Sequence, residues 1–353
     1  MVFERNNCMS DNELGLSVDG LSRKMVAATE QSHAYAKKGD MSLAAWQQSL
    51  KARVLELLAI PGLPRPAPQV RFVEEARQDG YIRRRGYMLA ADGLDVPFYL
   101  LEPDPRPAGP MGLCIAAHGH GPGKVIPAGI AIDDASRALI EGGQRDYGVQ
   151  AAKRGYLTIV PDWRGMGELM LAEDIHRNKG NSCQQLSMRG MHMGRPLPGQ
   201  RVSDAMQFVD WGLAQDNIDA SNVVMTGNSG GGTMTLFTAA IDSRITAAAP
   251  SCYFSTFADS ILAMDHCPCN FVPGLFKVAE MSDLAGLVAP RPMLIIAGTK
   301  DTIFPIDAVR AGFAAARKIY TDANAADNLE LYEGTAGHRY YSARVWNFFS
   351  EKR

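Results

Sequence analysis

One serine lies between glycines at a sharp corner of the chain, in the segment GNSGG (residues 227–231). Apolar residues precede this segment and a helix-compatible stretch follows it, which is the context of a G-x-S-x-G nucleophile elbow. Such a turn strains the serine backbone and lifts its hydroxyl out of the sheet, and only tiny neighbours let strand and helix approach so closely. The N-terminus of the following helix would favour developing negative charge. We therefore predict that Ser229 is a nucleophile.

A serine hydroxyl needs a base that takes its proton, and His338 is the candidate base. It follows the last expected strand, in YEGTAGHRYY, and it alone of the seven histidines lies downstream of both Ser229 and a suitable acid. That acid is Asp301, in LIIAGTKDTIFP, which would fix the tautomer of the imidazole and stabilise the imidazolium. Glu333 and Asp307 are nearby rival acids, and Glu333 is the better substitute. We predict a triad of Ser229, Asp301 and His338.

An acyl-transfer site also needs two hydrogen-bond donors for the tetrahedral oxyanion. The backbone N–H of Gly230, directly after the candidate nucleophile, would be one of them. The second would be the backbone N–H of His120 in HGHGPG (residues 118–123), where small residues let the backbone approach a carbonyl group. His118 and His120 could also form a metal-binding pair, but no acidic or histidine companions lie obviously nearby. We predict an oxyanion hole and no metal.

Three further groups of residues carry weaker signals. Arg164, in PDWRGMGE, either contacts substrate or pins its loop to a carboxylate, and His118 is a second candidate for substrate binding. The six cysteines are scattered and do not resemble a disulfide scaffold. The segment CPC (residues 267–269) lacks the two-residue gap of a zinc knuckle and has no matching second pair. We expect it to be a structural turn, and we expect no cofactor.

Apolar runs at helix-sized intervals would position these residues. They are MGLCIAAHGHG, YLTIVPDWRGMGE, VVMTGNS, RITAAAPSC, RPMLIIAGTKD and LELYEGTAGH. Apolar runs without alternation suit strands covered on both faces, as in a parallel sheet. YIRRRGYMLA and LDVPFYLLEP, joined by the turn signal ADG, read as antiparallel edge strands. The pattern predicts an α/β fold with a mostly parallel central sheet, antiparallel N-terminal edge strands and helices on both faces, including helices near 135–154 and 202–215.

The first 68 residues read as a helical extension that ends in a proline-rich connector, PGLPRPAP (residues 61–68). Leu43, Trp46, Leu50 and Val54 form one apolar helix face, with Asp40 or Ser42 as its cap. This extension is too short to hold a core alone, so it packs on the main body or on another subunit. Residues 69–353 would form the catalytic domain. Its two long insertions, at about 168–200 and 255–287, would be either substrate loops or ordinary packing.

The composition excludes several classes of protein. The chain has 353 residues, 46% hydrophobic and 21% charged, which is ordinary for a globular protein. The net charge of -2 comes without long acidic or basic runs, so neither nucleic-acid binding nor membrane-surface binding is expected. The first residues lack the apolar core of a signal peptide, and no stretch reaches about 18 uninterrupted apolar residues. We expect a cytoplasmic protein.

The motifs HGHG, PDWRGMGE, GNSGGG, GTKDTIFP and GTAGHRY, in that order, resemble the α/β-hydrolase superfamily of serine hydrolases. Within it the likeness is to bacterial acetyl xylan esterase and dienelactone hydrolase-like proteins, over about residues 70–353. The resemblance implies cleavage of a carboxylic ester with a small or medium acyl group, such as an acetylated sugar, through an acyl-enzyme. Two features depart from these relatives. Dienelactone hydrolases proper use a cysteine where this chain has Ser229, and many deacetylases carry a glutamine at the position of Gly230.

Two other functions compete with the esterase. A serine peptidase or amidase would use the same fold and triad, although the chain has no room for the propeller domain of prolyl-oligopeptidase-type enzymes. A phosphate- or nucleotide-binding module would use the glycine-rich turn alone. GNSGGGT lacks the lysine of a P-loop and the G-x-G-x-x-G spacing of a dinucleotide fold, so this second alternative is the weaker one.

Overall fold

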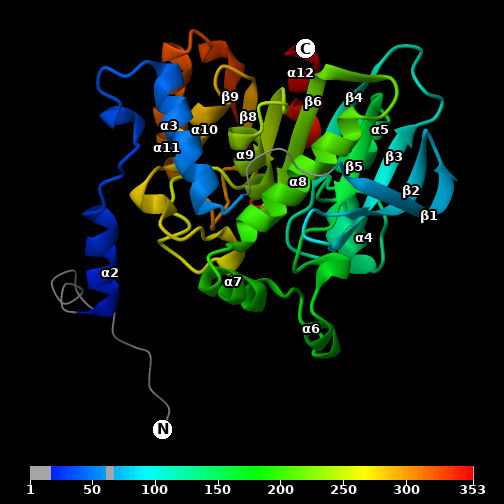
Figure 1. Ribbon diagram of the computed structural model, residues 1–353, viewed down its shortest axis with the longest axis horizontal. Coiled ribbons are helices and arrows are strands. Elements are labelled where there is room, and N and C mark those ends of the chain that lie inside the picture. The colour runs from blue at the N-terminus through cyan, green and yellow to red at the C-terminus, as the bar shows by residue number, and fades with distance from the viewer. Residues whose placement is uncertain (1–16, 61–66, 353) are drawn as a thin grey trace.

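The computed structural model describes residues 17–60 and 67–352, and within these residues it contains a single nine-stranded sheet (Figure 1). The strand order is β1-β2-β3-β5-β4-β6-β7-β8-β9. The strands are β1 (Gln69–Gln78), β2 (Tyr81–Leu89), β3 (Asp95–Pro103), β4 (Met111–Ala117), β5 (Tyr156–Pro161), β6 (Ile218–Asn228), β7 (Ala247–Ser251), β8 (Met293–Gly298) and β9 (Leu329–Gly334). The pairs from β1 to β5 along this order are antiparallel, and all pairs from β5 to β9 are parallel. The predicted mostly parallel sheet with an antiparallel N-terminal edge is confirmed.

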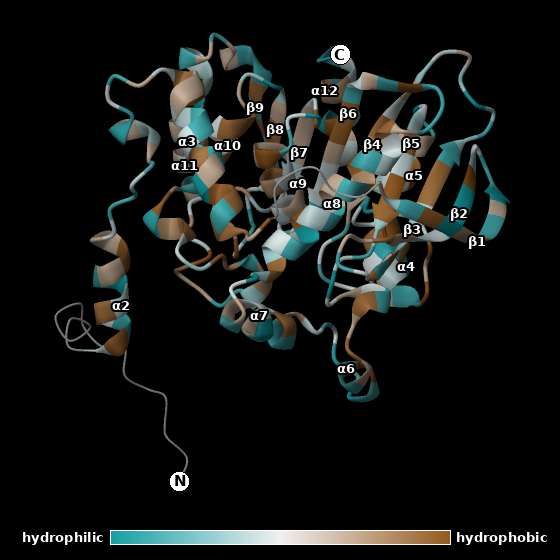
Figure 2. Ribbon diagram, in the orientation of Figure 1, coloured by the Kyte–Doolittle hydropathy of each residue, from teal (hydrophilic) through white to brown (hydrophobic). Residues whose placement is uncertain are grey.

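Helices cover both faces of the sheet, because alternate strand residues point to opposite sides. Leu113 and Ile115 of β4 join one core cluster, whereas Cys114 and Ala116 join the other. The first cluster includes side chains from α3 (Leu43–Leu57), α8 (Leu197–Leu213), α9 (Gly230–Ile241), α10 (Met281–Val288) and α11 (Ile306–Asp322). The second includes α5 (Tyr147–Ala152) and α12 (Ser342–Glu351). Figure 2 shows the matching concentration of hydrophobic residues in the central strands.

The N-terminal helix α3 packs on the main body. Ser42 is its N-cap, and the Ser42 hydroxyl accepts a hydrogen bond of 3.2 Å from the backbone N–H of Ala45. Trp46, Leu50 and Val54 are buried in the same core cluster as the side chains of α9 and α10. The proline-rich connector falls mainly on residues 61–66, which lie outside the described residues, so its stiffness stays a prediction.

A short helix upstream, α2 (Val18–Ala27), extends away from the main body (Figures 1 and 2). Val18, Leu21 and Met25 are spaced so that they lie on one side of this helix, and they are 86%, 57% and 64% exposed. This apolar face has no cover from the described part of the chain.

Both long insertions contain secondary structure. The first holds η3 (Gly167–Leu169), α6 (Ala172–His176) and α7 (Cys183–His192), and the second holds η4 (Pro268–Asn270), η5 (Leu275–Lys277) and most of α10. The single helix expected near 135–154 is two helices, α4 (Asp134–Glu141) and α5, because a pair of glycines at 142–143 ends the first. The remaining 3-10 turns are η1 (Tyr35–Lys37), η2 (Gly123–Val125) and η6 (Ala326–Asn328). None of the helices in residues 17–60 and 67–352 is both long and apolar enough to span a membrane.

Candidate active site

Ser229 occupies a strained turn between β6 and α9. Its backbone angles are φ 57° and ψ −120°, a conformation that a residue with a side chain adopts only when its surroundings enforce it. The glycines on either side explain how this turn is held. A methyl group at Gly227 would lie 2.3 Å from the carbonyl oxygen of Ala117, and one at Gly231 would lie 1.9 Å from the same atom. Because both positions press against β4, the sequence needs glycine at each, and the serine is left partly exposed at the tip.

Asp301 and His338 meet at the carboxyl ends of two neighbouring parallel strands. Gly298 at the end of β8 is in register with Gly334 at the end of β9, so the loops that follow lie side by side. The His338 Nδ1–H donates to Asp301 Oδ2 at 2.7 Å. The Asp301 side chain is only 1% exposed, whereas that of His338 is 25% exposed. The imidazole therefore has one nitrogen fixed by a buried carboxylate, while part of its side chain remains exposed.

Further contacts hold this pair in place. Asp301 Oδ1 accepts hydrogen bonds from the backbone N–H groups of Ile303 at 3.0 Å and Phe304 at 3.2 Å. The Phe304 ring stacks on the His338 ring, with centroids 5.8 Å apart and planes inclined by 19°. The orientation of the imidazole is thus set by both packing and hydrogen bonding, as a general base requires.

The two rival acids have other partners. Glu333 accepts two hydrogen bonds from the guanidinium of Arg310, at 2.9 and 2.7 Å, and Asp307 pairs with the same arginine at 3.3 Å. The pKa of the Glu333 carboxyl is lowered by this arginine. Neither carboxylate contacts His338 among the hydrogen bonds and ion pairs of residues 17–60 and 67–352. Asp301 is therefore the acid that the fold places beside the imidazole.

The end of β7 connects the serine turn to the acid–base pair. The backbone N–H of Ser229 donates to the carbonyl oxygen of Ser251 at 2.8 Å, and Cys252 follows directly. The Cys252 sulfur, a carboxylate oxygen of Asp301 and a ring nitrogen of His338 all lie within 4.8 Å of one another. Among the hydrogen bonds of residues 17–60 and 67–352, none joins the Ser229 hydroxyl to His338. Catalytic hydrogen bonds are commonly long without substrate, so the proton transfer between them belongs to the proposal below.

The loop after β4 lies against the serine turn. A methyl group at Gly119 would be 2.5 Å from the carbonyl oxygen of Asn228 and 3.2 Å from Cβ of Ser229. The hydroxyl of Tyr147 donates to the carbonyl oxygen of Ala117 at 2.7 Å and so fixes the end of β4. The segment that contains His120 and the first residue of α9, Gly230, are therefore neighbours. Their role as oxyanion donors stays a prediction.

His118 has a structural position. Its side chain is 2% exposed; Nδ1–H donates to the carbonyl oxygen of Gly119 at 2.7 Å, and Nε2 accepts from the backbone N–H of Trp163 at 3.1 Å. Burial lowers the pKa of His118 to about 4, which keeps the ring neutral. Since both ring nitrogens are engaged, nothing in these contacts supports the predicted substrate-binding role.

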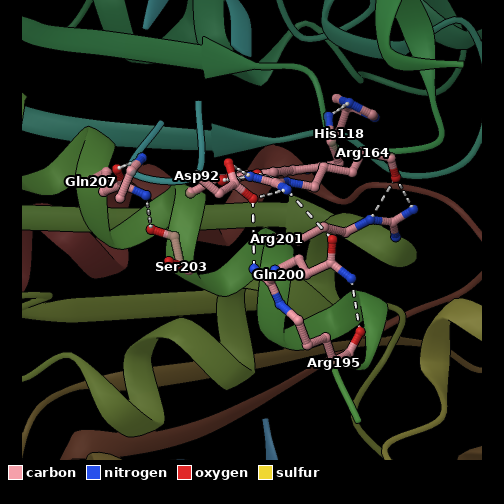
Figure 3. Close-up of polar contacts among 11 residues, drawn as sticks. Asp92, His118, Arg164, Arg195, Gln200, Arg201, Ser203 and Gln207 are labelled. Atoms are coloured by element: carbon pink, nitrogen blue, oxygen red, sulfur yellow. Dashed lines mark hydrogen bonds and ion pairs between the residues drawn. The ribbon is translucent and has the colours of Figure 1, made fainter. Parts of the chain in front are cut away.

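Arg164 is also fully engaged, as Figure 3 shows. Its guanidinium binds both oxygens of Asp204, at 2.7 Å each, and both oxygens of Asp92, at 2.6 and 3.0 Å. The Arg164 carbonyl oxygen accepts two hydrogen bonds from Arg201, at 3.0 and 2.6 Å. Of the two roles weighed for Arg164, these contacts favour pinning the loop to a carboxylate; contact with substrate stays a prediction.

Arg145 gave no signal in the sequence, yet it borders the site. Its guanidinium donates to the carbonyl oxygen of His338 at 3.2 Å, and its Nε is buried without a hydrogen-bond partner. Burial lowers the pKa of this side chain. A single sequence does not show whether an arginine in a loop between two helices is buried or exposed to solvent. Only the fold shows that Arg145 supports the His338 loop.

Within residues 17–60 and 67–352, two groups of side chains bring together enough ligand atoms for a metal. One is Cys252 with Asp301 and His338, but burial raises the pKa of the Cys252 thiol to about 12, so it is a protonated and poor ligand. The other is His120 with three cysteines, whose positions are Cys183, Cys267 and Cys269. The sequence offered His120 and the CPC segment only as separate, weak metal-ligand candidates and did not show that they meet Cys183, because the members come from three distant segments.

Comparison with known proteins places the chain in a family. A model of the Abhydrolase family matches residues 7–333. The chain belongs to this α/β-hydrolase family. The hydrolase YtaP of Bacillus subtilis (strain 168) is 23% identical over 249 residues, which are 69% of this chain and 77% of that protein. The resemblance to α/β hydrolases is thereby confirmed.

Solved structures share the α/β-hydrolase fold. One, described as an acetyl xylan esterase from Bacteroides fragilis NCTC 9343, has a TM-score of 0.75 and 20% identity, covering 90% of this chain and 82% of that one. A CE15 glucuronoyl esterase from Teredinibacter turnerae T7901 has a TM-score of 0.64 and 14% identity, covering 90% and 87%. At these identities the likeness shows the fold, and the substrates of those proteins stay their own.

Proposed function

We propose that this α/β hydrolase cleaves carboxylic esters through a triad of Ser229, Asp301 and His338. The observation that carries the proposal is the hydrogen bond between His338 and the buried Asp301. These residues follow the carboxyl ends of parallel strands, as does the strained Ser229 turn. A carboxylate that orients an imidazole beside a raised serine is the arrangement that activates a hydroxyl.

In the proposed reaction the Ser229 Oγ attacks the ester carbonyl carbon while His338 Nε2 takes the hydroxyl proton. The negative charge moves to the carbonyl oxygen, where the backbone N–H groups of Gly230 and His120 would donate hydrogen bonds. His338 then returns the proton to the leaving alcohol, and an acyl-enzyme remains on Ser229. Water, deprotonated by the same imidazole, attacks the carbonyl carbon of the acyl-enzyme. As the bond to Ser229 Oγ breaks, His338 returns the proton to this oxygen and the acid is released.

The substrate we propose is an ester of a small or medium acyl group, such as the acetate of a sugar. The fold shared with carbohydrate esterases supports this class, as does the chemistry of the site, which needs no cofactor. A serine amidase or peptidase on the same fold is the alternative. Such an amidase would cleave an anilide or peptide with the same triad. An esterase releases an alcohol and an amidase releases an amine, so the leaving group distinguishes the two functions.

A panel of p-nitrophenyl esters of increasing acyl length, with acetylated sugars and a matched anilide, tests this proposal. We expect wild-type turnover of the short esters and a loss of roughly a thousandfold or more in Ser229→Ala, because the triad acts as a unit. The exposed Ser22, on α2, gives the matched control Ser22→Ala, which should keep full activity.

Labelling with a fluorophosphonate reports the nucleophile without reference to a substrate. We expect covalent modification of Ser229 in the wild type and in Ser22→Ala, and none in Ser229→Ala. Unchanged ester turnover in Ser229→Ala would rule the triad out. Preference for the anilide over the ester would replace the esterase with the amidase.

A further inference from the structure

Four soft metal ligands converge beside the candidate active site. The atoms are the Sγ of Cys183, Cys267 and Cys269 and a ring nitrogen of His120, and all lie within 4.8 Å of one another. His120 comes from the loop after β4, and Cys183 begins α7 in the first insertion. In the second insertion, Cys267 is the N-cap of η4 and Cys269 lies within it. The three cysteines are free, and Cys183 and Cys269 are buried.

The separations approach those of a tetrahedral zinc site. With Zn–S of about 2.3 Å and Zn–N of about 2.0 Å, a tetrahedron sets its sulfurs roughly 3.8 Å apart and sulfur and nitrogen roughly 3.5 Å apart. The sulfurs of Cys267 and Cys269 are 3.2 Å apart, and His120 Nε2 is 3.3 Å from the sulfur of Cys269 and 3.8 Å from that of Cys183. These three separations differ from the ideal values by a few tenths of an ångström, and the other three separations are within 4.8 Å.

The charge around the cluster fits the same ion. Arg201 is buried and donates to the sulfur of Cys183 at 3.1 Å, and the ion pairs of residues 17–60 and 67–352 include none for its guanidinium. A buried cation needs a compensating negative charge nearby. Zinc with three thiolates and a neutral imidazole carries one net negative charge, and Arg201 balances it. The buried carboxylate of Asp204 also attracts this guanidinium, and the zinc cluster would add a negative charge directly beside it.

We propose that His120, Cys183, Cys267 and Cys269 bind one Zn²⁺ ion. Three cysteines and one histidine form a ligand set that suits zinc and holds it four-coordinate. Because the protein supplies all four ligands, no position is left for water or substrate, and the ion is structural. The site ties the loop after β4 to both insertions.

One consequence rests on the proposed function. His120 would contribute its side chain to zinc and its backbone N–H to the oxyanion, so the ion would fix the position of that donor. Loss of zinc should then lower kcat for esters more than it changes KM, because the donor acts in the transition state.

The direct test is the metal content of the wild-type chain purified under reducing conditions without chelators, measured by inductively coupled plasma mass spectrometry. We expect about one zinc per chain, and little zinc in Cys183→Ser/Cys269→Ser. Cys114→Ala is the matched control, since Cys114 is a buried free cysteine in the other core cluster, and it should keep the full zinc content.

A spectroscopic test avoids variants that fail to fold. After removal of zinc from the wild type, added Co²⁺ should produce thiolate-to-cobalt charge-transfer absorption and the strong visible bands of tetrahedral cobalt. Less than about a tenth of a metal per chain with no such bands from the reduced protein would overturn the site. Stoichiometric iron with iron–sulfur absorption would also overturn it. Ser229→Ala should hold the same zinc as the wild type, so failure of the triad and failure of the metal site are separate results.

Discussion

The imidazole of His338 and the carboxylate of Asp301 are joined by a hydrogen bond of 2.7 Å across 37 residues of sequence. The contact exists because β8 and β9 are parallel neighbours that end in register, so their following loops meet at one edge of the sheet. The buried carboxylate fixes which ring nitrogen carries the proton, and this leaves the other nitrogen free to act as a base.

Replacing Asp301 tests whether Asp301, and not Glu333, is the acid of the proposed triad. We expect Asp301→Asn to lower kcat by roughly a thousandfold to ten-thousandfold, because an amide can favour the wrong tautomer of His338. Glu333→Gln is the control, since Glu333 pairs with Arg310 at the sheet edge and should change kcat little. Steady-state kinetics on a short p-nitrophenyl ester decides; equal losses in both variants would contradict the assignment.

Adding one methyl group at Gly119 should disturb the loop that would supply an oxyanion donor. The new Cβ would lie 2.5 Å from the carbonyl oxygen of Asn228, so the loop must move away from the serine turn. We expect Gly119→Ala to lower kcat by roughly a hundredfold and to leave KM less affected. Gly109→Ala, which meets no atom within 4 Å, is the control. If Gly119→Ala reacted like the wild type, the oxyanion loop would be wrongly placed.

Glu280 should make stability depend on pH. This carboxylate caps α10, and burial raises its pKa to about 7 from a usual value of 4.5, with the nearby Asp283 adding in the same direction. Between these two values the folded state binds more protons than the unfolded state, so the free energy of unfolding falls as pH rises. Above about pH 7 the Glu280 carboxyl is ionised in both states, and the cost of ionising it in its buried site lowers the free energy of unfolding by at most roughly 3 kcal/mol.

The variant Glu280→Gln tests this dependence. It cannot ionise, so the difference in unfolding free energy between about pH 5 and pH 8 should shrink, measured by urea titration. Asp283 has its own pKa raised by burial, so part of the slope should remain. An identical slope in the wild type and the variant would show that Glu280 is ionised throughout this range.

The apolar face of α2 is the proposed contact with a second copy of the chain. Val18, Leu21 and Met25 expose large side chains on one side of a helix that stands off from the body (Figure 2). We expect a dimer by light scattering, and we expect Leu21→Asp to shift it toward monomer. Ser22→Asp, which adds the same charge at the next residue, should leave the dimer intact. A wild-type monomer at every concentration would refute the contact.

The positions of the candidate catalytic residues could be predicted because each follows an apolar run. Ser229 directly follows β6, whereas Asp301 lies three residues after the end of β8 and His338 four residues after the end of β9. The carboxyl ends of parallel strands gather at one edge of the sheet. The sheet itself followed from the same runs. β1 was missed because its sequence, QVRFVEEARQ, is largely charged and the strand is mostly exposed at the sheet edge, so no apolar periodicity marks it.

What the sequence could not show is contact between distant loops. His120 and Cys183 are 63 residues apart, and Cys269 is 149 residues from His120. No local spacing brings them together; the two insertions must first fold over the loop after β4. The partners of Arg164 were hidden for the same reason, since Asp92 and Asp204 flank it from different parts of the chain.

The Trp46 ring fills the space left by a missing side chain in α10. A methyl group at Gly286 would lie 2.6 Å from the side chain of Ile319 and 2.9 Å from this ring, so the two side chains share the space. The indole N–H donates to the carbonyl oxygen of His33 at 2.9 Å. The N-terminal segment that carries α3 therefore packs against the second insertion. We expect the amides of both segments to be protected from hydrogen exchange together, as one cooperative unit. Proteolytic removal of the N-terminal segment should then speed hydrogen exchange in the second insertion, which contains η4.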